Sequence, residues 1–309
     1  MDLSIVIVTY QSRQEIGPCL ESIRRRKPMA DFEVFVVDNA SKDGTAEYVQ
    51  QRAPWVTLIK NPNNDGFGRA NNLAIKQARG RYVLALNPDT RVTEDALDRL
   101  LLVASELDKQ KILGTLGPRL VFQDGGEQVS SYQLPSVWSE LRKLWFAEKK
   151  DEKQARTRPL TRVGWSAGSA LLFPRELEGE LTLFDPGIFL YSEDTELCWR
   201  MRAKGRRSYV TALATIEHAF NKSGEQYFGP KAEGHEKRLR AYRDTTQYVM
   251  RKCLRGPLKE LRVWSYSQLV ALNSRWHIIL IKLFGSRITD HPQTALEEHR
   301  ARAHAFSTR

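Results

Sequence analysis

The sequence predicts an α/β fold with a largely parallel central sheet, and three observations lead to this prediction. Over roughly the first 120 residues, short apolar runs alternate with segments of helical periodicity, which is typical of strands joined by helices. Hydrophobic residues make up 41% of the chain, enough for a packed core. Polar residues follow several apolar runs, at the position where open α/β sheets bind ligands. With 309 residues, the chain can form one large domain or two smaller ones.

Strands are predicted where apolar residues run together, and helices where they recur every three or four positions. The expected order in the first part is strand 3–10, helix 16–23, strand 32–40, helix 44–52, strand 56–61, helix 69–78 and strand 81–88. Thr93 then precedes an apolar-periodic segment and is expected to cap a helix over 94–107.

The pattern becomes less regular in the second part. A strand with a turn is expected at 112–122, a further apolar stretch at 164–175, and a helix at 191–205 that ends at Gly205. Residues 140–160 are rich in charge and predict an exposed loop or a flexible flap. From about residue 221 helix-forming residues dominate, so helices are expected to the end of the chain.

Charge and cysteine content restrict the function classes. The net charge of +11 favours anionic partners, namely nucleic acid, anionic lipid or phosphorylated small molecules. The sequence lacks zinc-finger spacing and the motifs of helix-turn-helix and RNP-type proteins, so we expect no nucleic-acid partner. Three cysteines without metal or disulfide spacing, and a start without signal-peptide features, predict a cytoplasmic protein.

Polar residues follow four of the apolar runs and are candidates for a site: Asp38 with Asn39, Asp89, Glu193 with Asp194, and His218. Each alone has a structural explanation, because turns and helix starts use the same residue types. Asn87-Pro88-Asp89, for example, is ordinary turn chemistry. The combination in one α/β chain favours a ligand site.

Six motifs occur in an order that resembles one enzyme family. They are SIVIVTYQS (4–12), VVDNASKDGT (36–45), NPNNDGFGRANN (61–72), LALNPDT (84–90), YSEDTELCWR (191–200) and HAFNKS (218–223). With these motifs the chain resembles family 2 glycosyltransferases of the GT-A fold, and among them bacterial rhamnosyltransferases of surface polysaccharide synthesis. The resemblance implies a catalytic domain at 1–222 with a mixed central sheet, made of a Rossmann-like nucleotide-sugar half (1–90) and a metal and acceptor half (91–222). Residues 223–309 would form a helical C-terminal extension.

The resemblance implies a nucleotide-sugar donor, with dTDP-β-L-rhamnose preferred and a UDP-hexose or UDP-galactofuranose as the alternative. The family's Asp-X-Asp motif is Asn87-Pro88-Asp89 here, so only its last acid is present. Mn²⁺ or Mg²⁺ would be bound by Asp89 and His218, and imidazole suits Mn²⁺ better. The residues that the resemblance assigns to donor binding are Thr9, Tyr10, Asp38, Asn39, Asn64, Gly66, Arg69, Asn87 and Asp89.

The family's chemistry implies a single displacement that inverts the anomeric carbon and needs one general base. We assign Asp194 as this base and Glu193 as a supporting or acceptor-orienting acid, although the sequence leaves their order open. Trp165, Gly168 and Glu193 are the expected acceptor-binding residues. The missing first acid of Asp-X-Asp also leaves open a degenerate fold that serves as a partner subunit. Nucleotidyl transfer is disfavoured because the first strand lacks a basic, glycine-rich phosphate loop.

Residues 274–287 carry apolar side chains between basic ones and are too short to span a bilayer. The segment could lie in a membrane interface as a peripheral contact at the inner face of the cell membrane, near a glycan or lipid-linked acceptor. A helix packed on the catalytic domain or on a second subunit of a homo-oligomer explains the pattern slightly better.

Overall fold

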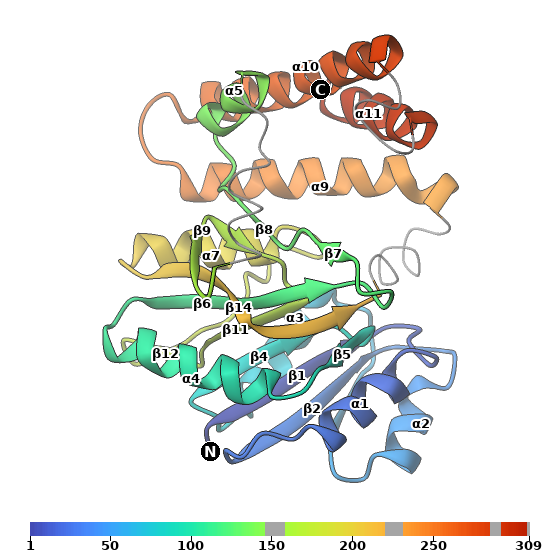
Figure 1. Ribbon diagram of the computed structural model, residues 1–309, viewed down its shortest axis with the longest axis vertical. Helices are drawn as coiled ribbons and strands as arrows, with labels where there is room; N and C mark the ends of the chain where they lie inside the picture. The colour runs from blue at the N-terminus through green and yellow to red at the C-terminus, as the bar shows by residue number, and fades with distance from the viewer. Residues whose placement is uncertain (146–157, 220–230, 285–291, 308–309) are drawn as a thin grey trace. The chain divides into compact units, whose positions relative to one another are not determined.

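The computed structural model describes residues 1–145, 158–219, 231–284 and 292–307 (Figure 1). Contacts divide the chain into two units, one of residues 1–133 and 151–226 and one of residues 134–150 and 227–309. The sequence analysis placed residues 134–150 in the catalytic domain. They belong to the second unit because α5 (Val137–Trp145) packs against α10 (Lys259–Phe284).

The first unit is built on a mixed sheet. Among the described residues its main path has the order β3-β2-β1-β4-β11-β6-β14-β5, with β7 beside β6 and β9 beside β14. These strands are β1 (Leu3–Thr9), β2 (Phe32–Asn39), β3 (Thr57–Asn61), β4 (Tyr82–Leu86), β5 (Thr90–Val92), β6 (Leu113–Val121), β7 (Glu127–Gln128), β9 (Thr161–Val163), β11 (Ala170–Pro174) and β14 (Arg207–His218). β3, β2, β1 and β4 are parallel, whereas β11 is antiparallel to β4 and β6. Two short pairs lie outside this sheet, β8 (Ser131–Tyr132) with β10 (Trp165–Ser166) and β12 (Glu176–Leu177) with β13 (Glu180–Leu181).

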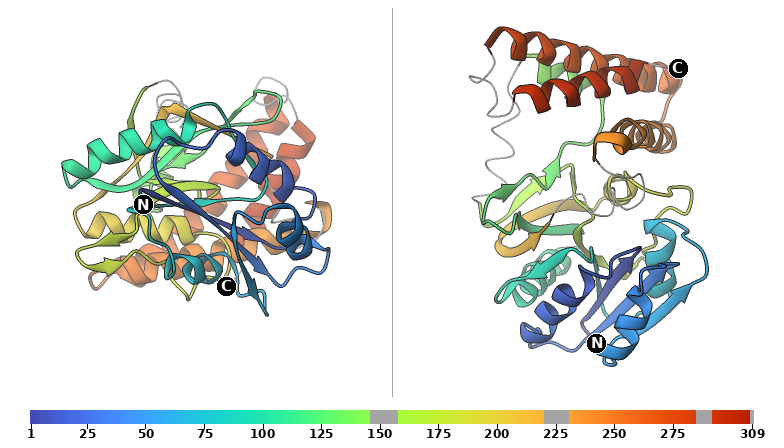
Figure 2. Two further views of the ribbon diagram at one scale, coloured as in Figure 1. Left: turned by 90° about the horizontal axis from the view of Figure 1, so that it is seen from below. Right: turned by 90° about the vertical axis from the view of Figure 1, so that its right-hand side faces the viewer.

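Helices cover both faces of the sheet (Figure 2). α1 (Ile16–Arg25), α2 (Thr45–Arg52) and α4 (Ala96–Lys109) pack on one face, and α3 (Phe67–Ile75) and α7 (Glu193–Ala203) on the other. Side chains along a strand point alternately to the two faces, so Ile5 and Ile7 join the first core, and Val6 and Val8 join the second. This two-sided burial explains the continuous apolar strands of the sequence.

The expected order of strands and helices in the first part is confirmed, with shifts at some ends. α3 begins at Phe67 rather than at residue 69, and α4 begins at Ala96. The expected Thr93 cap is wrong, because its hydroxyl donates to the Thr215 carbonyl at 2.6 Å and accepts no N–H of α4, whose N-cap position is held by Asp95. Part of the expected loop at 140–160 is also wrong, since α5 reaches Trp145. Residues 146–157 of that loop lie outside the described residues.

The second unit is helical, as expected for the end of the chain. It contains α5, α9 (Lys231–Cys253), α10 and α11 (Pro292–Ser307), and α10 packs against each of the others. The Asn273 side chain donates to the Glu140 carbonyl at 3.0 Å and so ties α10 to α5. Along the part of the chain that the structure describes, no helix is both long and apolar enough to cross a membrane.

Candidate functional site

Two strand ends supply the first group of site candidates. Thr9 ends β1, and its hydroxyl donates to the Asp38 carboxylate at the end of β2, at 3.0 Å. The backbone N–H of Ser41 donates to the other Asp38 oxygen at 3.1 Å. Asp38 is buried but keeps lone pairs beyond these two hydrogen bonds. Tyr10, next in the chain after Thr9, is half-buried. The structure therefore brings Thr9 and Asp38 together, as the strand pairing requires.

A network of amides shapes the loop after β3. The Asn39 side chain donates to Asn64 at 2.8 Å and accepts from the Asn61 amide at 2.8 Å. Gly66 has φ +84°, a left-handed conformation, and a Cβ there would collide with the carbonyl of Phe189. Packing against the chain itself thus accounts for this glycine. Arg69 is exposed, and its Nε donates to the Pro186 carbonyl at 2.6 Å.

Asp89, which follows β4, and His218, which ends β14, lie close together. β14 pairs antiparallel with β5, which sets His218 opposite Thr90 and places its Nε2 3.4 Å from the Asp89 carboxylate. Both residues are buried, and neither Asp89 oxygen accepts a hydrogen bond from the residues that the structure describes. A buried carboxylate without hydrogen-bond donors is costly, so this geometry fits a bound cation.

Gln128 contacts the opposite side of the same imidazole. Its Oε1 lies 3.1 Å from His218 Nδ1, and Gln128 is itself buried. An amide oxygen can only accept, so Nδ1 donates to Gln128, and Nε2 is the ring nitrogen that faces Asp89. Asp89 and His218 remain a pair, since no group of three or more His, Cys, Asp or Glu residues suited to a metal occurs within the described ranges.

The acid pair Glu193 and Asp194 begins α7. Asp194 accepts hydrogen bonds from the backbone N–H groups of Gly168, at 2.8 Å, and Thr195, at 2.6 Å, and a third from the Thr195 hydroxyl. Glu193 Oε2 has no hydrogen-bond partner among the described residues. Burial raises the pKa of Glu193 to about 8, and the adjacent Asp194 adds to the rise. Burial also raises the pKa of Asp194, but its N–H and O–H donors oppose that rise. The donors therefore favour the negative charge on Asp194 and the proton on Glu193.

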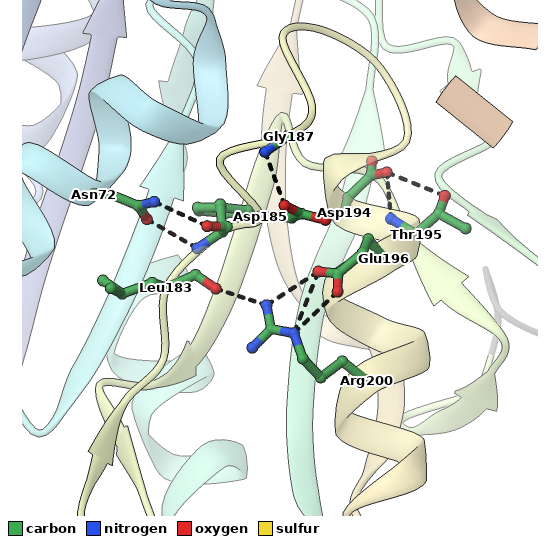
Figure 3. Close-up of polar contacts among 9 residues, drawn as sticks. Asn72, Leu183, Asp185, Gly187, Asp194, Thr195, Glu196 and Arg200 are labelled. Carbon is green, nitrogen blue, oxygen red and sulfur yellow. Dashed lines mark hydrogen bonds and ion pairs between the residues drawn. The ribbon is translucent and has the colours of Figure 1, made fainter. Parts of the chain in front are cut away.

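Two further contacts fix the position of α7 (Figure 3). The fully buried Glu196 forms an ion pair with Arg200 at 3.0 Å, and Arg200 also donates to the Leu183 carbonyl at 2.6 Å. The neighbouring Phe184 exchanges two hydrogen bonds with the Asn72 side chain of α3, at 2.8 and 2.9 Å. The segment 183–184 therefore connects the acid-bearing helix to the helix that follows the Asn64–Gly66 loop.

Two of the expected acceptor residues, Trp165 and Gly168, lie in the segment 165–169, and the third, Glu193, begins α7. Gly168 contacts Asp194 through the hydrogen bond above, and the next residue, Ser169, accepts at its carbonyl from the Asn87 N–H at 2.9 Å. This chain of contacts links the Asn87-Pro88-Asp89 turn to the acid pair. Trp165 differs, because its indole N–H donates to the Gln133 carbonyl and its ring stacks on Tyr132 at 4.7 Å. No hydrogen bond among the described residues joins Trp165 to the acids.

Sequence reasoning missed Gln128, Asn61 and Thr195. Gln128 lies in a strand of two residues, which is too short to show a periodic pattern. Asn61 and Thr195 stand inside the quoted motifs, and this was the signal that could have found them; Thr195 also directly follows Asp194.

The raised pKa of Glu193 predicts that stability depends on pH. Between about 4.5, its ordinary pKa, and about 8, the folded protein holds a proton that the unfolded chain has lost, so the free energy of unfolding falls as pH rises. Glu193→Gln cannot ionise and is expected to weaken this fall. Urea midpoints measured from pH 5 to pH 8 test it, with the exposed Glu94→Gln as control. Equal pH slopes for Glu193→Gln and the parent would contradict the assigned protonation.

Comparison with known proteins gives one family. The model of the family described as "Glycosyl transferase family 2" matches residues 4–172. An N-acetylglucosaminyl-diphospho-decaprenol L-rhamnosyltransferase of Mycobacterium tuberculosis is 30% identical over 265 residues, which cover 76% of this chain and 81% of that protein. A poly(ribitol-phosphate) beta-glucosyltransferase of Bacillus spizizenii is 32% identical over 121 residues, 38% of this chain and 19% of that protein.

A solved structure confirms the predicted GT-A fold. The mannosyltransferase PcManGT from Pyrobaculum calidifontis, in complex with GDP-Man and Mn²⁺, has a TM-score of 0.62 and 18% identity, covering 99% of this chain and 85% of the other. With the family model matching more than half of the chain, this protein is a glycosyltransferase and belongs to glycosyl transferase family 2.

Proposed function

We propose that the protein transfers a sugar, with inversion and with the help of a divalent cation, from a nucleotide-sugar donor to a glycan or lipid-linked glycan. L-Rhamnose from dTDP-β-L-rhamnose is the favoured donor sugar, because a relative that is 30% identical over 76% of this chain is a rhamnosyltransferase. The buried Asp89 carboxylate beside His218 is the observation that carries the proposal. A charge so placed, without hydrogen bonds among the described residues, fits a cation that faces a diphosphate.

Asp89 and His218 would hold the cation, and oxygen and imidazole ligands together suit Mn²⁺, with Mg²⁺ as the alternative. When bound, the cation neutralises the charge that develops on the leaving nucleoside diphosphate. Gln128 is the positioning residue that keeps His218 Nε2 available, since it accepts from Nδ1. The PcManGT structure, which has a similar fold at 18% identity, is a complex with GDP-Man and Mn²⁺.

Asp38 would recognise the nucleobase. A carboxylate only accepts hydrogen bonds, so its remaining lone pairs suit the imide N–H of thymine or uracil. Thr9 and Tyr10 would line this pocket, and Asn39 would shape it through Asn64 and Gly66. Arg69 and Asn87 complete the proposed donor contacts.

Asp194 would act as the general base toward the acceptor hydroxyl, because its donors favour the ionised carboxylate that a base requires. Glu193, protonated near neutral pH, would donate to or orient the acceptor together with Gly168 and Trp165. We propose that the first unit carries this chemistry and that residues 223–309 serve as the helical extension, joined by α5 of residues 134–150. A cytoplasmic location at the inner face of the membrane would bring the enzyme to a lipid-linked acceptor.

Calorimetric titration with dTDP and with UDP, each with and without Mn²⁺, tests the proposal. We expect dTDP to bind more tightly than UDP, and Mn²⁺ to tighten binding of both. Tighter binding of UDP would move the donor to a UDP-hexose or UDP-galactofuranose. Binding of neither nucleotide, with the protein folded, would overturn the donor assignment and favour a degenerate partner subunit.

A further inference from the structure

α10 is apolar on two opposite faces. Its inner face, which includes Val263, Tyr266 and Val270, is buried in the second unit. The outer face carries large hydrophobic residues that remain exposed. We call these residues the outer stripe: Leu261, Trp264, Leu272, Trp276 and Ile279, with Leu258 just before the helix. At 3.6 residues per turn they fall within about a third of the helix circumference.

The exposure of the outer stripe is large for side chains of this size. Trp264 is 59% exposed and Trp276 is 46% exposed. A row of exposed apolar side chains on one helix face marks an interaction surface, and in this row the exposed Gln268 stands between Trp264 and Leu272. The stripe therefore needs a partner that covers it.

Basic residues border the outer stripe. Helical spacing places Arg275 and Lys282 along one margin and Arg262 along the other, and all three are exposed. The only acid within α10 is Glu260, and Arg251 donates to it at 3.0 Å. The exposed face of α10 thus combines apolar side chains with unneutralised positive charge from its own helix.

We propose that the outer stripe docks on an anionic lipid bilayer. Leucine and isoleucine side chains would enter the interfacial region, the two tryptophans suit the headgroup level, and the bases would contact anionic headgroups. A second copy of the chain fits less well. A two-fold contact would place the basic residues of one outer stripe against the equally basic outer stripe of the other copy, where like charges repel. Docking on a bilayer would bring the enzyme close to a lipid-linked acceptor. Only this consequence rests on the proposed function.

The stripe also differs in position from the segment 274–287, for which the sequence offered membrane contact as the alternative to helix packing. The exposed apolar row begins near residue 258, about four turns earlier along the chain by the helical repeat. Residues 285–287 lie outside the described residues. The earlier half of the row escapes a linear search because buried and exposed apolar residues alternate along α10.

Vesicle flotation of the full-length protein tests the proposal. The vesicles contain phosphatidylcholine with or without phosphatidylglycerol, and neither donor nor acceptor, so the result does not depend on sugar transfer. We expect binding to the anionic vesicles, and at least about a tenfold loss of partitioning in Leu272→Gln/Trp276→Gln. Arg275→Gln/Lys282→Gln is expected to lose binding to the anionic vesicles by about tenfold as well.

The matched control is Trp55→Gln/Leu102→Gln, which removes one exposed tryptophan and one exposed leucine from the first unit. It is expected to float like the parent. Parent-like flotation of Leu272→Gln/Trp276→Gln, or no flotation of the parent, would overturn the proposal. So would a parent dimer in light scattering that the stripe variant converts to monomer, because the occupant would then be a second copy. Nucleotide binding by calorimetry reports separately on the proposed function.

Discussion

Asp194→Asn is expected to lower the turnover of sugar transfer by about 10³-fold and to leave nucleotide affinity unchanged. The amide cannot take the proton that the acceptor hydroxyl loses, whereas the proposed donor contacts lie on other residues. Rates measured by release of nucleoside diphosphate, with affinity from calorimetry, separate the two effects. An unchanged turnover would remove Asp194 as the base.

Glu193→Gln is the matched variant for this experiment. If Glu193 carries the proton near neutral pH, its amide isostere keeps the same charge, and we expect less than about a tenfold loss of turnover. A loss in Glu193→Gln as large as in Asp194→Asn would mean that the pair shares the role of base. A larger loss would reverse the assignment that the hydrogen bonds of Gly168 and Thr195 support.

Fold integrity needs its own readout in Asp194→Asn. The Asn side chain offers one acceptor oxygen where Asp194 offers two, so one of the two backbone N–H donors loses its partner. Such a loss costs on the order of 1–3 kcal/mol. We therefore expect a lower melting temperature, and circular dichroism at the assay temperature must show a folded protein before the rate is interpreted.

Asp89→Asn is expected to weaken Mn²⁺ binding by on the order of a hundredfold or more, and to abolish the Mn²⁺-dependent part of nucleotide binding. The substitution removes the only carboxylate of the Asp89–His218 pair. Electron paramagnetic resonance of free Mn²⁺, measured with dTDP present, gives the affinity without any assay of transfer.

Thermal unfolding provides a second test of Asp89. Mn²⁺ should raise the melting temperature of the parent and leave that of Asp89→Asn unchanged. Without metal, Asp89→Asn should be at least as stable as the parent, because the parent buries a carboxylate that accepts no hydrogen bond from the described residues. An equal Mn²⁺ response in both proteins would place the cation elsewhere.

Two further variants complete this experiment, one as a control and one as a test of Gln128. Asp124→Asn changes an exposed aspartate in the turn before β7 and should bind Mn²⁺ like the parent. Gln128→Met removes the acceptor for His218 Nδ1, and we expect about a tenfold weaker Mn²⁺ affinity because the imidazole is no longer held in one tautomer. Parent-like affinity in Gln128→Met would leave Gln128 without a positioning role.

The sequence by itself determined the alternation of strands and helices in the first part of the chain. It also determined the places where polar residues follow the strands. Apolar runs buried on both faces leave a strong local pattern, so β1, β2 and β4 are recognisable one at a time. The motifs around Asp38, Asp89 and Glu193 are likewise local, since each lies within a few residues of the element that positions it. Family membership followed from these motifs.

Only the tertiary structure decided which of these side chains meet. His218 reaches Asp89 because β14 pairs with β5, and Gly168 reaches Asp194 because the segment after β10 contacts α7; both contacts join residues far apart in the chain. The division of charge between Glu193 and Asp194 depends on the hydrogen-bond donors that the fold supplies. The outer stripe of α10 also required the structure. A residue type has the same hydrophobicity in the sequence whether it is buried or exposed, so only packing distinguishes the two apolar faces of the helix.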